Sequence, residues 1–256
     1  MLLQEPRLQG VALGSAEWFT IQRDLIAEKP LLKHCYDAWY AALLRDEATV
    51  PADQPGILLE LGSGGSYLAE LRPDVITSDI VPGAASQVID ARHIPYPDNS
   101  VRAIFLTHAL HHIPQVEAFF AEAQRVLVPG GVVAMIEVAH TPLARAFFSH
   151  MHPEPYDDRA HAWDFAQNDA MADANQALSW LVFVRDKQRF AVEFPGLQIE
   201  QFEYLPWFSY LASGGVTRRS VLPGPLARVA LAADVLTRPL GGLVSLHWHI
   251  RLRKQL

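Results

Sequence analysis

The sequence has little cysteine, no clustered basic residues and no long apolar run. Its one cysteine, Cys35, excludes an intramolecular disulfide framework and indicates a reducing compartment, where packing is its favoured role and a nucleophile the alternative. Acidic residues outnumber basic ones, 28 to 21, and no lysine or arginine run could follow a phosphate backbone, so no nucleic-acid partner is expected. No stretch reaches the ~20 apolar residues of a spanning helix. The N-terminus also lacks a signal-peptide pattern, so we expect a soluble, cytoplasmic protein.

Half of the residues are hydrophobic, and their spacing alternates between strand-like and helix-like segments. Short apolar runs predict strands at 57–61, 75–79, 88–89, 103–107, 132–138, 197–205 and 243–252. Helical spacing covers 17–46, 115–127, pieces near 175–193 and 225–238, and the Pro-Gly-Gly at 129–131 should end the second of these. The alternation predicts an α/β fold with a Rossmann-like, doubly wound, seven-stranded mixed sheet.

One domain spanning 1–256 is expected, in four parts. They are N-terminal helices (1–50), a cofactor-binding core (55–140), an acceptor-side insertion (141–215), which forms a lid between strands five and six, and a C-terminal helix with the last strand (216–256). The helix at 225–238 is apolar on both faces, so burial is the favoured interpretation. A protein or peripheral membrane contact through 221–240 is the alternative. The oligomeric state is left open.

A glycine-rich turn follows the first predicted strand, in the segment Glu60-Leu61-Gly62-Ser63-Gly64-Gly65-Ser66. In a doubly wound sheet, ligands bind at the carboxyl ends of the strands, and glycine lets the backbone approach them closely. The second strand ends at Asp79, whose carboxylate could accept hydrogen bonds from two ribose hydroxyls, and Asp90 follows the third strand. A dinucleotide-binding turn would carry a small residue where Tyr67 stands, so a nicotinamide enzyme is disfavoured.

Five segments in order resemble the motifs of the class I S-adenosylmethionine-dependent methyltransferase superfamily, type 11-like. They are ILLELGSGGS (57–66), VITSDI (75–80), VIDARHIPYPDNSV (88–101), AIFLTHALHHIP (103–114) and FFAEAQRVLVPGGVVAMIE (119–137). Two positions depart from the pattern. Ser66 replaces a glycine, and Arg102 replaces an acid at a position expected to be exposed.

The resemblance implies S-adenosylmethionine as cofactor and assigns contacts to it. Residues Glu60, Gly62, Ser63 and Gly64 would line the methionine and ribose, Asp79 with Ile80 the ribose, Asp90 with Ala91 the adenine, and Thr107 with His108 the sulfonium. Capping of a turn or helix is the alternative role for Asp79 and Asp90.

Histidines after the fourth strand are candidates for the acceptor side. The spacing of His108, His111 and His112 could suggest a metal, but no carboxylate or cysteine stands nearby in the sequence, so none is expected. His111 is a catalytic candidate, and stabilisation of the loop by His111 and His112 is the favoured alternative. His247 and His249 share one face of the last strand and should face solvent or a neighbouring helix.

The segment Ser149–Asp157 follows the fifth strand and contains two stiffening prolines. It resembles an H-x-E-P-[FY]-D block of one bacterial branch of the superfamily. We predict an acceptor site at His152 and Glu154, with His152 as general base. The alternative is a structural ion-pair cluster of Glu154 with Asp157, Arg185 and Asp186. Aromatic residues that could wall the acceptor pocket are Trp163, Phe165, Trp180, Tyr204, Trp207, Phe208 and Tyr210.

These features predict methyl transfer to a hydroxyl or amine of a small molecule, sugar or lipid-linked intermediate. The alternative is a non-catalytic, methyltransferase-like binding subunit in a surface-polysaccharide or lipid pathway. The nature of the acceptor atom is left open by the sequence.

Overall fold

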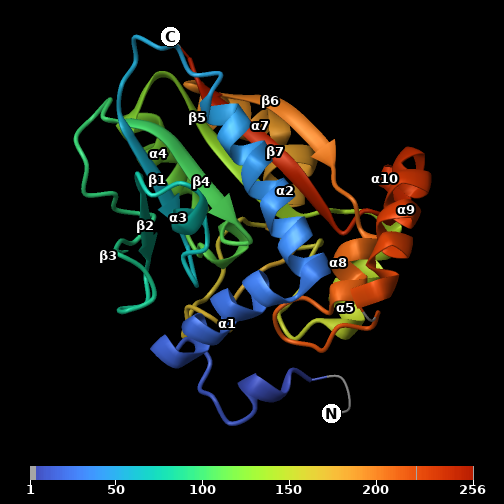
Figure 1. Ribbon diagram of the computed structural model, residues 1–256. Helices are drawn as coiled ribbons and strands as arrows, with labels where there is room; N and C mark the ends of the chain where they lie inside the picture. The colour runs from blue at the N-terminus through green and yellow to red at the C-terminus, as the bar shows by residue number, and fades with distance from the viewer. Residues whose placement is uncertain (1–3, 223, 256) are drawn as a thin grey trace.

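The computed structural model describes residues 4–222 and 224–255, which build one seven-stranded sheet with the order β3-β2-β1-β4-β5-β7-β6. The last strand along the chain, β7, is antiparallel to β5 and β6, and the other neighbouring pairs are parallel. The strands are β1 (Ile57–Leu61), β2 (Val75–Asp79), β3 (Gln87–Val88), β4 (Val101–Thr107), β5 (Leu127–Val138), β6 (Leu197–Tyr204) and β7 (His247–Lys254). The predicted Rossmann-like, seven-stranded mixed sheet is therefore confirmed (Figure 1).

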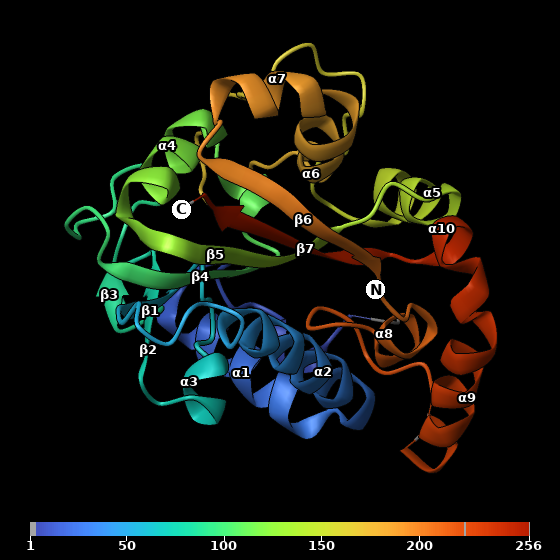
Figure 2. The ribbon, with the colours of Figure 1, turned by 90° about the horizontal axis from the view of Figure 1, so that it is seen from above.

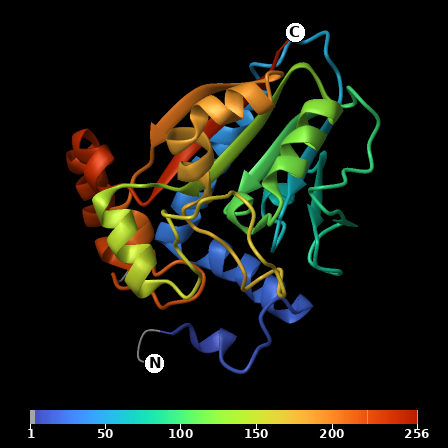
Figure 3. The same cartoon turned by 180° about the vertical axis from the view of Figure 1, so that it is seen from behind.

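Helices cover both faces of this sheet. Figure 2 shows α4, α6 and α7 on one face and α1, α2, α3 and α8 on the other, and Figure 3 shows α4 and α7 from behind. The α-helices are α1 (Ala16–Glu28), α2 (Pro30–Glu47), α3 (Leu68–Leu71), α4 (Val116–Val126), α5 (Pro142–Met151), α6 (Leu178–Trp180), α7 (Lys187–Glu193), α8 (Phe208–Ser213), α9 (Ala227–Thr237) and α10 (Gly241–Val244). Short 3-10 turns are η1 (Pro6–Leu8), η2 (Leu110–His112), η4 (Gly224–Leu226) and η5 (Arg238–Leu240), and η3 (Leu181–Arg185) is π-helical.

The central strands are mostly apolar because both of their faces are buried. Ile104 and Phe105 of β4 point to opposite faces, and each is fully buried in a different hydrophobic cluster. One cluster joins the sheet to α4 and α7, and the other joins it to α2. The carboxyl ends of β1, β2 and β4 are thus held rigidly between two packed layers.

The main differences from the expected element boundaries are three. The predicted helix 17–46 divides at Pro30, which begins α2 because proline is tolerated at the first turn of a helix. The fifth strand begins at Leu127, not 132, and runs through the Pro-Gly-Gly, where Gly130 has φ +76° and the pairing with β4 shifts register. Residues 241–244 form α10, so the last strand begins at His247 and not at 243.

One side-chain environment also differs from expectation, and two others take one of the expected forms. Arg102 is not exposed: its guanidinium bonds Glu47 and the carbonyls of Val50 and Gln54, tying the end of α2 to β4. His247 faces helices, one of the two expected environments: its fully buried ring lies 5.2 Å from that of Trp39 in α2 and 4.5 Å from that of Tyr210 in α8. His249 is also buried and faces a helix, with Nε2 2.7 Å from Asp46 Oδ2 of α2.

The C-terminal helix α9 lies beyond the end of the sheet, beside α8, and does not cover a sheet face (Figure 2). Only Ala230 and Asp234 of this helix are buried, whereas Val235 and Leu236 are 74% and 78% exposed. The favoured expectation of a buried helix was therefore wrong. None of the helices within 4–222 and 224–255 has the length and apolar character needed to cross a membrane.

Candidate functional site

A cavity of about 660 Å³ lies at the carboxyl ends of β1, β2 and β4. Its floor is made by the loops that follow these three strands, where a doubly wound sheet binds its ligands. Its walls come from α1, α2, α5, α8 and the loop 214–222. The volume lies within the range of small-molecule sites, about 300–1,000 Å³.

The glycine turn after β1 requires glycine at two positions. Gly62 has φ +66°, and a Cβ there would lie 2.6 Å from the Cβ of Ala109. Gly64 has φ +51°, and its Cβ would lie 2.9 Å from Gln22 Oε1 of α1. The left-handed backbone strains larger residues at both positions, and at Gly62 the contact with Ala109 also leaves no space for a side chain. The turn is fixed to β2 because the Ser78 N–H donates to Ser63 Oγ over 3.0 Å.

Asp79 ends β2 beneath this turn. Its Oδ2 accepts the N–H of Gly64 and its Oδ1 accepts the N–H of Val81, each over 3.0 Å. Burial raises the pKa of this carboxyl, and the two N–H donors oppose that shift. Each oxygen of a carboxylate has a second lone pair, so Asp79 caps the turn and can still accept from a ligand in the cavity.

The other predicted cofactor residues fall into two groups. Ser63, Ile80, Ala91, Thr107 and His108 line the cavity, and so does Asp90, whose carboxylate is bound by the Arg92 guanidinium at 2.7 and 2.9 Å. That guanidinium lowers the pKa of Asp90.

Glu60 belongs to the second group, because it lies behind the turn and is not among the lining residues described. It is 1% exposed, neither carboxyl oxygen has a hydrogen-bond partner in the described part of the chain, and burial raises its pKa to about 8.

His108 stands at the floor of the cavity with φ +56°. Its ring is stacked on that of Tyr210, with centroids 6.4 Å apart, and lies 4.6 Å from the ring of His247. Burial lowers the pKa of His108 to about 4, so the imidazole is neutral at pH 7. Within the described residues, His108 Nε2 and the nearby Thr107 Oγ1 are buried without hydrogen-bond partners.

His111 is fixed from behind by Glu137 of β5. The Nδ1–H donates to Glu137 Oε2 over 2.6 Å, and Glu137 Oε1 accepts the N–H groups of Ala109 and Leu110 at 3.0 and 2.7 Å. Burial alone would lower the pKa of His111, but the carboxylates of Glu137 and Glu154 raise it above its usual range. The expected role in stabilising the loop is thus seen in this contact.

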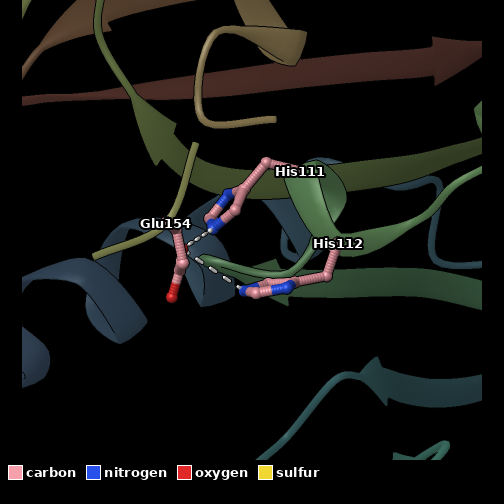
Figure 4. Close-up of side chains that lie close together, drawn as sticks. All are labelled: His111, His112 and Glu154. Atoms are coloured by element: carbon pink, nitrogen blue, oxygen red, sulfur yellow. Dashed lines mark ion pairs between the residues drawn. The ribbon is translucent and has the colours of Figure 1, made fainter. Parts of the chain in front are cut away.

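Glu154 lies between the rings of His111 and His112 (Figure 4). Its Oε2 is 3.6 Å from His111 Nε2 and 3.7 Å from His112 Nε2, and 3.9 Å from His152 Nδ1. The neighbouring imidazoles hold the pKa of Glu154 well below its usual range, although burial opposes this shift. The expectation that no carboxylate accompanies these histidines was wrong, because the chain returns to them about 40 residues later through the segment 149–157.

His152 follows α5 and lines the same cavity. Its Nδ1 faces the Glu154 N–H and the Gln176 side-chain amide, both at 3.4 Å. Burial lowers the pKa of His152. The alternative ion-pair cluster is not formed: Arg185 pairs with Asp186, whereas Glu154 faces the histidines.

Several lining residues were missed by sequence reasoning. They are Trp18, Phe19 and Gln22 of α1, Tyr36 and Tyr40 of α2, Gln176, and the loop 214–222. Of the seven aromatic residues proposed as pocket walls, Phe208 and Tyr210 line the cavity, whereas Trp163 lies in the core with Nε1 bonded to Asp186. Glu137 could have been noticed as the only acid in the otherwise apolar fifth strand.

Comparisons with known proteins agree with this geometry. A model of the methyltransferase domain matches residues 59–135. A sterol 24-C-methyltransferase from Gibberella zeae is 40% identical over 48 residues, 19% of this chain and 13% of that protein. A ubiquinone/menaquinone biosynthesis C-methyltransferase from Cupriavidus pinatubonensis is 37% identical over 60 residues, 23% of this chain and 25% of that protein. The match thus spans a quarter or less of the length of these relatives.

Among solved structures, geranyl diphosphate C-methyltransferase from Streptomyces coelicolor has the same fold. The two chains superpose with a TM-score of 0.53 over 92% of this chain and 83% of the other, at 13% identity. The strand order, the glycine turn over Asp79 and the match to a methyltransferase domain are three observations that favour the same fold family. Residues 59–135 thus match a methyltransferase domain, and the chain has the fold of the class I S-adenosylmethionine-dependent methyltransferases.

Proposed function

We propose that this chain transfers a methyl group from S-adenosylmethionine to an acceptor atom of a small molecule, sugar or lipid-linked intermediate. One observation carries the proposal. The glycine turn, Asp79 and the group of histidines with Glu154 all face one cavity. A site with a donor half and an acceptor half is what methyl transfer between two bound molecules needs.

The residues of the donor half fit the cofactor. Gly62 and Gly64 leave the turn open to a ligand that side chains would exclude. Asp79 retains lone pairs for ribose hydroxyls, and Thr107 Oγ1 is a buried polar atom without a partner among the described residues. When bound, S-adenosylmethionine supplies a methyl group on a sulfonium, whose sulfur leaves as a neutral thioether.

The acceptor half has to position the nucleophile and remove its proton. The acceptor atom forms a bond to the methyl carbon as the carbon–sulfur bond breaks, and the bonding pair goes to sulfur. A hydroxyl or amine then loses a proton, which we assign to the imidazole of His152, a residue that lines the cavity. Glu154 Oε2, 3.9 Å away, stabilises the resulting imidazolium.

The wall of the acceptor half favours an apolar body with an anionic group. Phe147, Phe148 and Met151 of α5 line it, and Arg218 and Arg219 line the same cavity. The named relatives act on a sterol and in ubiquinone/menaquinone biosynthesis, and both are C-methyltransferases, so a carbon nucleophile is the alternative acceptor atom.

We further propose a cytoplasmic protein whose segment 221–240 contacts a membrane surface through its exposed apolar side chains.

Ligand-dependent thermal unfolding tests the donor. We expect S-adenosylmethionine and S-adenosylhomocysteine to raise the melting temperature and NAD to leave it unchanged, because only a ligand of the native state stabilises it. Absence of any response to the first two ligands would refute the proposal. Incubation with apolar alcohols, amines and quinols, with release of S-adenosylhomocysteine as the readout, then identifies the acceptor.

The variant His152→Ala tests the acceptor half. We expect turnover to fall by about 100-fold or more, the usual contribution of a positioned base, with unchanged affinity for S-adenosylhomocysteine. The matched control is His150→Ala, two residues earlier and exposed on α5. Equal turnover in both variants would exclude His152 as the base. Cofactor binding without transfer to any acceptor would favour the alternative of a non-catalytic binding subunit.

A further inference from the structure

Three potential metal ligands meet at one point of the cavity wall. The nearest ligand atoms of His111, His112 and Glu154 all lie within 4.8 Å of one another. Figure 4 shows both rings turned toward the same oxygen of Glu154, while the other oxygen points away from them. Two of these residues come from η2, and the third comes from the segment after α5.

The tautomers of both histidines are set by fixed hydrogen bonds. His111 Nδ1 faces the Glu137 carboxylate at 2.6 Å, and His112 Nδ1 faces the backbone carbonyl of Asp173 at 3.3 Å. Both of these partners accept hydrogen bonds, so each Nδ1 carries a hydrogen. Each Nε2 therefore faces Glu154, and its lone pair is available to a metal ion that displaces any proton from that nitrogen.

This arrangement of ligand atoms is suited to a bound metal ion. Glu154 Oε2 lies 3.6 and 3.7 Å from the two Nε2 atoms, so a positive charge among the three groups stabilises them, and either a proton on His111 or a metal ion can supply it. Ligands of a tetrahedral zinc ion with bonds near 2.1 Å are about 3.4 Å apart, close to these separations. The Glu137–His111 contact also has the form of the carboxylate–histidine pair that supports many metal ligands.

We propose that His111, His112 and Glu154 bind one divalent transition-metal ion of the zinc class, with Glu137 as the residue that orients His111. Two imidazoles and one carboxylate are the donors such ions prefer, whereas magnesium and calcium prefer oxygen ligands alone. Three protein ligands leave at least one coordination position for another molecule.

The position of the three ligands suggests what that molecule is. All three residues line the cavity, as does His152. An acceptor with a hydroxyl, enol or phenol oxygen could therefore occupy the remaining position. This assignment of the acceptor rests on the proposed function, whereas metal binding itself does not.

Metal binding can be measured on the whole chain without any acceptor. After treatment with a chelator, we expect the protein to retain one Zn²⁺ per chain on equilibrium dialysis, and Co²⁺ to give the visible absorption bands of a tetrahedral site. Glu154→Gln and His112→Gln should abolish stoichiometric binding, and His161→Gln, an exposed histidine outside the group, should not alter it. Circular dichroism shows whether each variant is folded.

The variant Glu137→Gln separates a built site from adventitious binding. It leaves all three ligands in place, and we expect Zn²⁺ affinity to fall 10- to 100-fold, as is typical for loss of an orienting carboxylate. Failure of the wild-type protein to bind Zn²⁺ or Co²⁺ would overturn the proposal and would mean that a proton on His111 occupies this position. So would unchanged binding in both ligand variants. Response to S-adenosylhomocysteine is measured in parallel, so failure of the donor site is seen separately.

Discussion

Glu60 carries a carboxyl group in the interior, where neither oxygen finds a hydrogen-bond partner within the described residues. Burial raises its pKa to about 8 from 4.5, so the folded chain retains a proton that the unfolded chain loses. The contribution of the protonated Glu60 to the free energy of unfolding is complete below about pH 4.5. It then falls by ~1.4 kcal/mol per pH unit and is lost at about pH 8.

The variant Glu60→Gln removes this titration without removing the side-chain volume. We expect the free energy of unfolding of the wild type, relative to the variant, to fall by about 2–3 kcal/mol between pH 6 and pH 8. Urea unfolding at several pH values measures it. Glu17→Gln, at an exposed position of α1, is the control for loss of a carboxyl group. A difference between wild type and Glu60→Gln that does not vary with pH would contradict the expectation.

At the scale of elements, α9 presents an apolar surface that no other part of the described chain covers. Val229, Val235 and Leu236 are 58%, 74% and 78% exposed, and the Arg238 side chain beside them is 82% exposed. Apolar side chains flanked by cations are typical of helices that lie on an anionic membrane surface.

Substitution of two of these side chains tests the contact. We expect the protein to sediment with vesicles that contain phosphatidylglycerol. The double variant Val235→Asp, Leu236→Asp should bind them at least about 100-fold more weakly, since each buried side chain contributes roughly 1.5 kcal/mol or more. Val192→Asp is the matched control, because Val192 of α7 is 79% exposed but lies on the other side of the sheet (Figure 2). Equal binding of wild type and double variant would exclude α9 as the contact.

The elements that could be predicted from the sequence are those with a local cause. Strand β1 is found with its expected ends because a run of five apolar or buried residues precedes glycines that require a turn. The course of β5 through Pro-Gly-Gly could not be foreseen, since its pairing with β7 comes from the distant C-terminus. The exposure of α9 escaped prediction for a related reason: helix composition does not say where the helix packs.

In the candidate site, too, the features with a local cause could be predicted and those that depend on distant segments could not. The turn at Gly62 and Gly64 and its contact with Asp79 are short-range consequences of consecutive β-α units, so they could be predicted. The approach of Glu154 to His111 depends on the path of a long insertion, and no local pattern encodes it. The residue types in the sequence indicate which side chains could bind a ligand or transfer a proton, whereas the tertiary structure decides which of these side chains contact one another.

At the scale of the whole molecule, Lys29 joins segments from both halves of the chain over the cavity. Its Nζ donates to the carbonyls of Gly215 and Arg218, at 3.0 and 2.5 Å, and lies 3.1 Å from Glu5 Oε2. The backbone of Glu5 in turn bonds Thr217, over 2.9 Å. The N-terminal segment and the loop 214–222, which is a wall of the cavity, are thus held by one buried ammonium group.

The variant Lys29→Met should loosen this wall and weaken ligand binding. It removes the closer partner of Glu5 and leaves Arg7, whose Nε is 3.7 Å from Glu5 Oε1, so we expect a loss of about 1.5–3 kcal/mol of stability. We also expect a dissociation constant for S-adenosylhomocysteine that is higher by about tenfold or more, because binding must then order the loop. Thermal unfolding and titration calorimetry measure the two effects, with Lys33→Met, whose side chain is 44% exposed, as control. A less stable variant with unchanged affinity would show that the cavity wall holds its shape without Lys29, and that the donor half depends on β1, β2 and β4 alone.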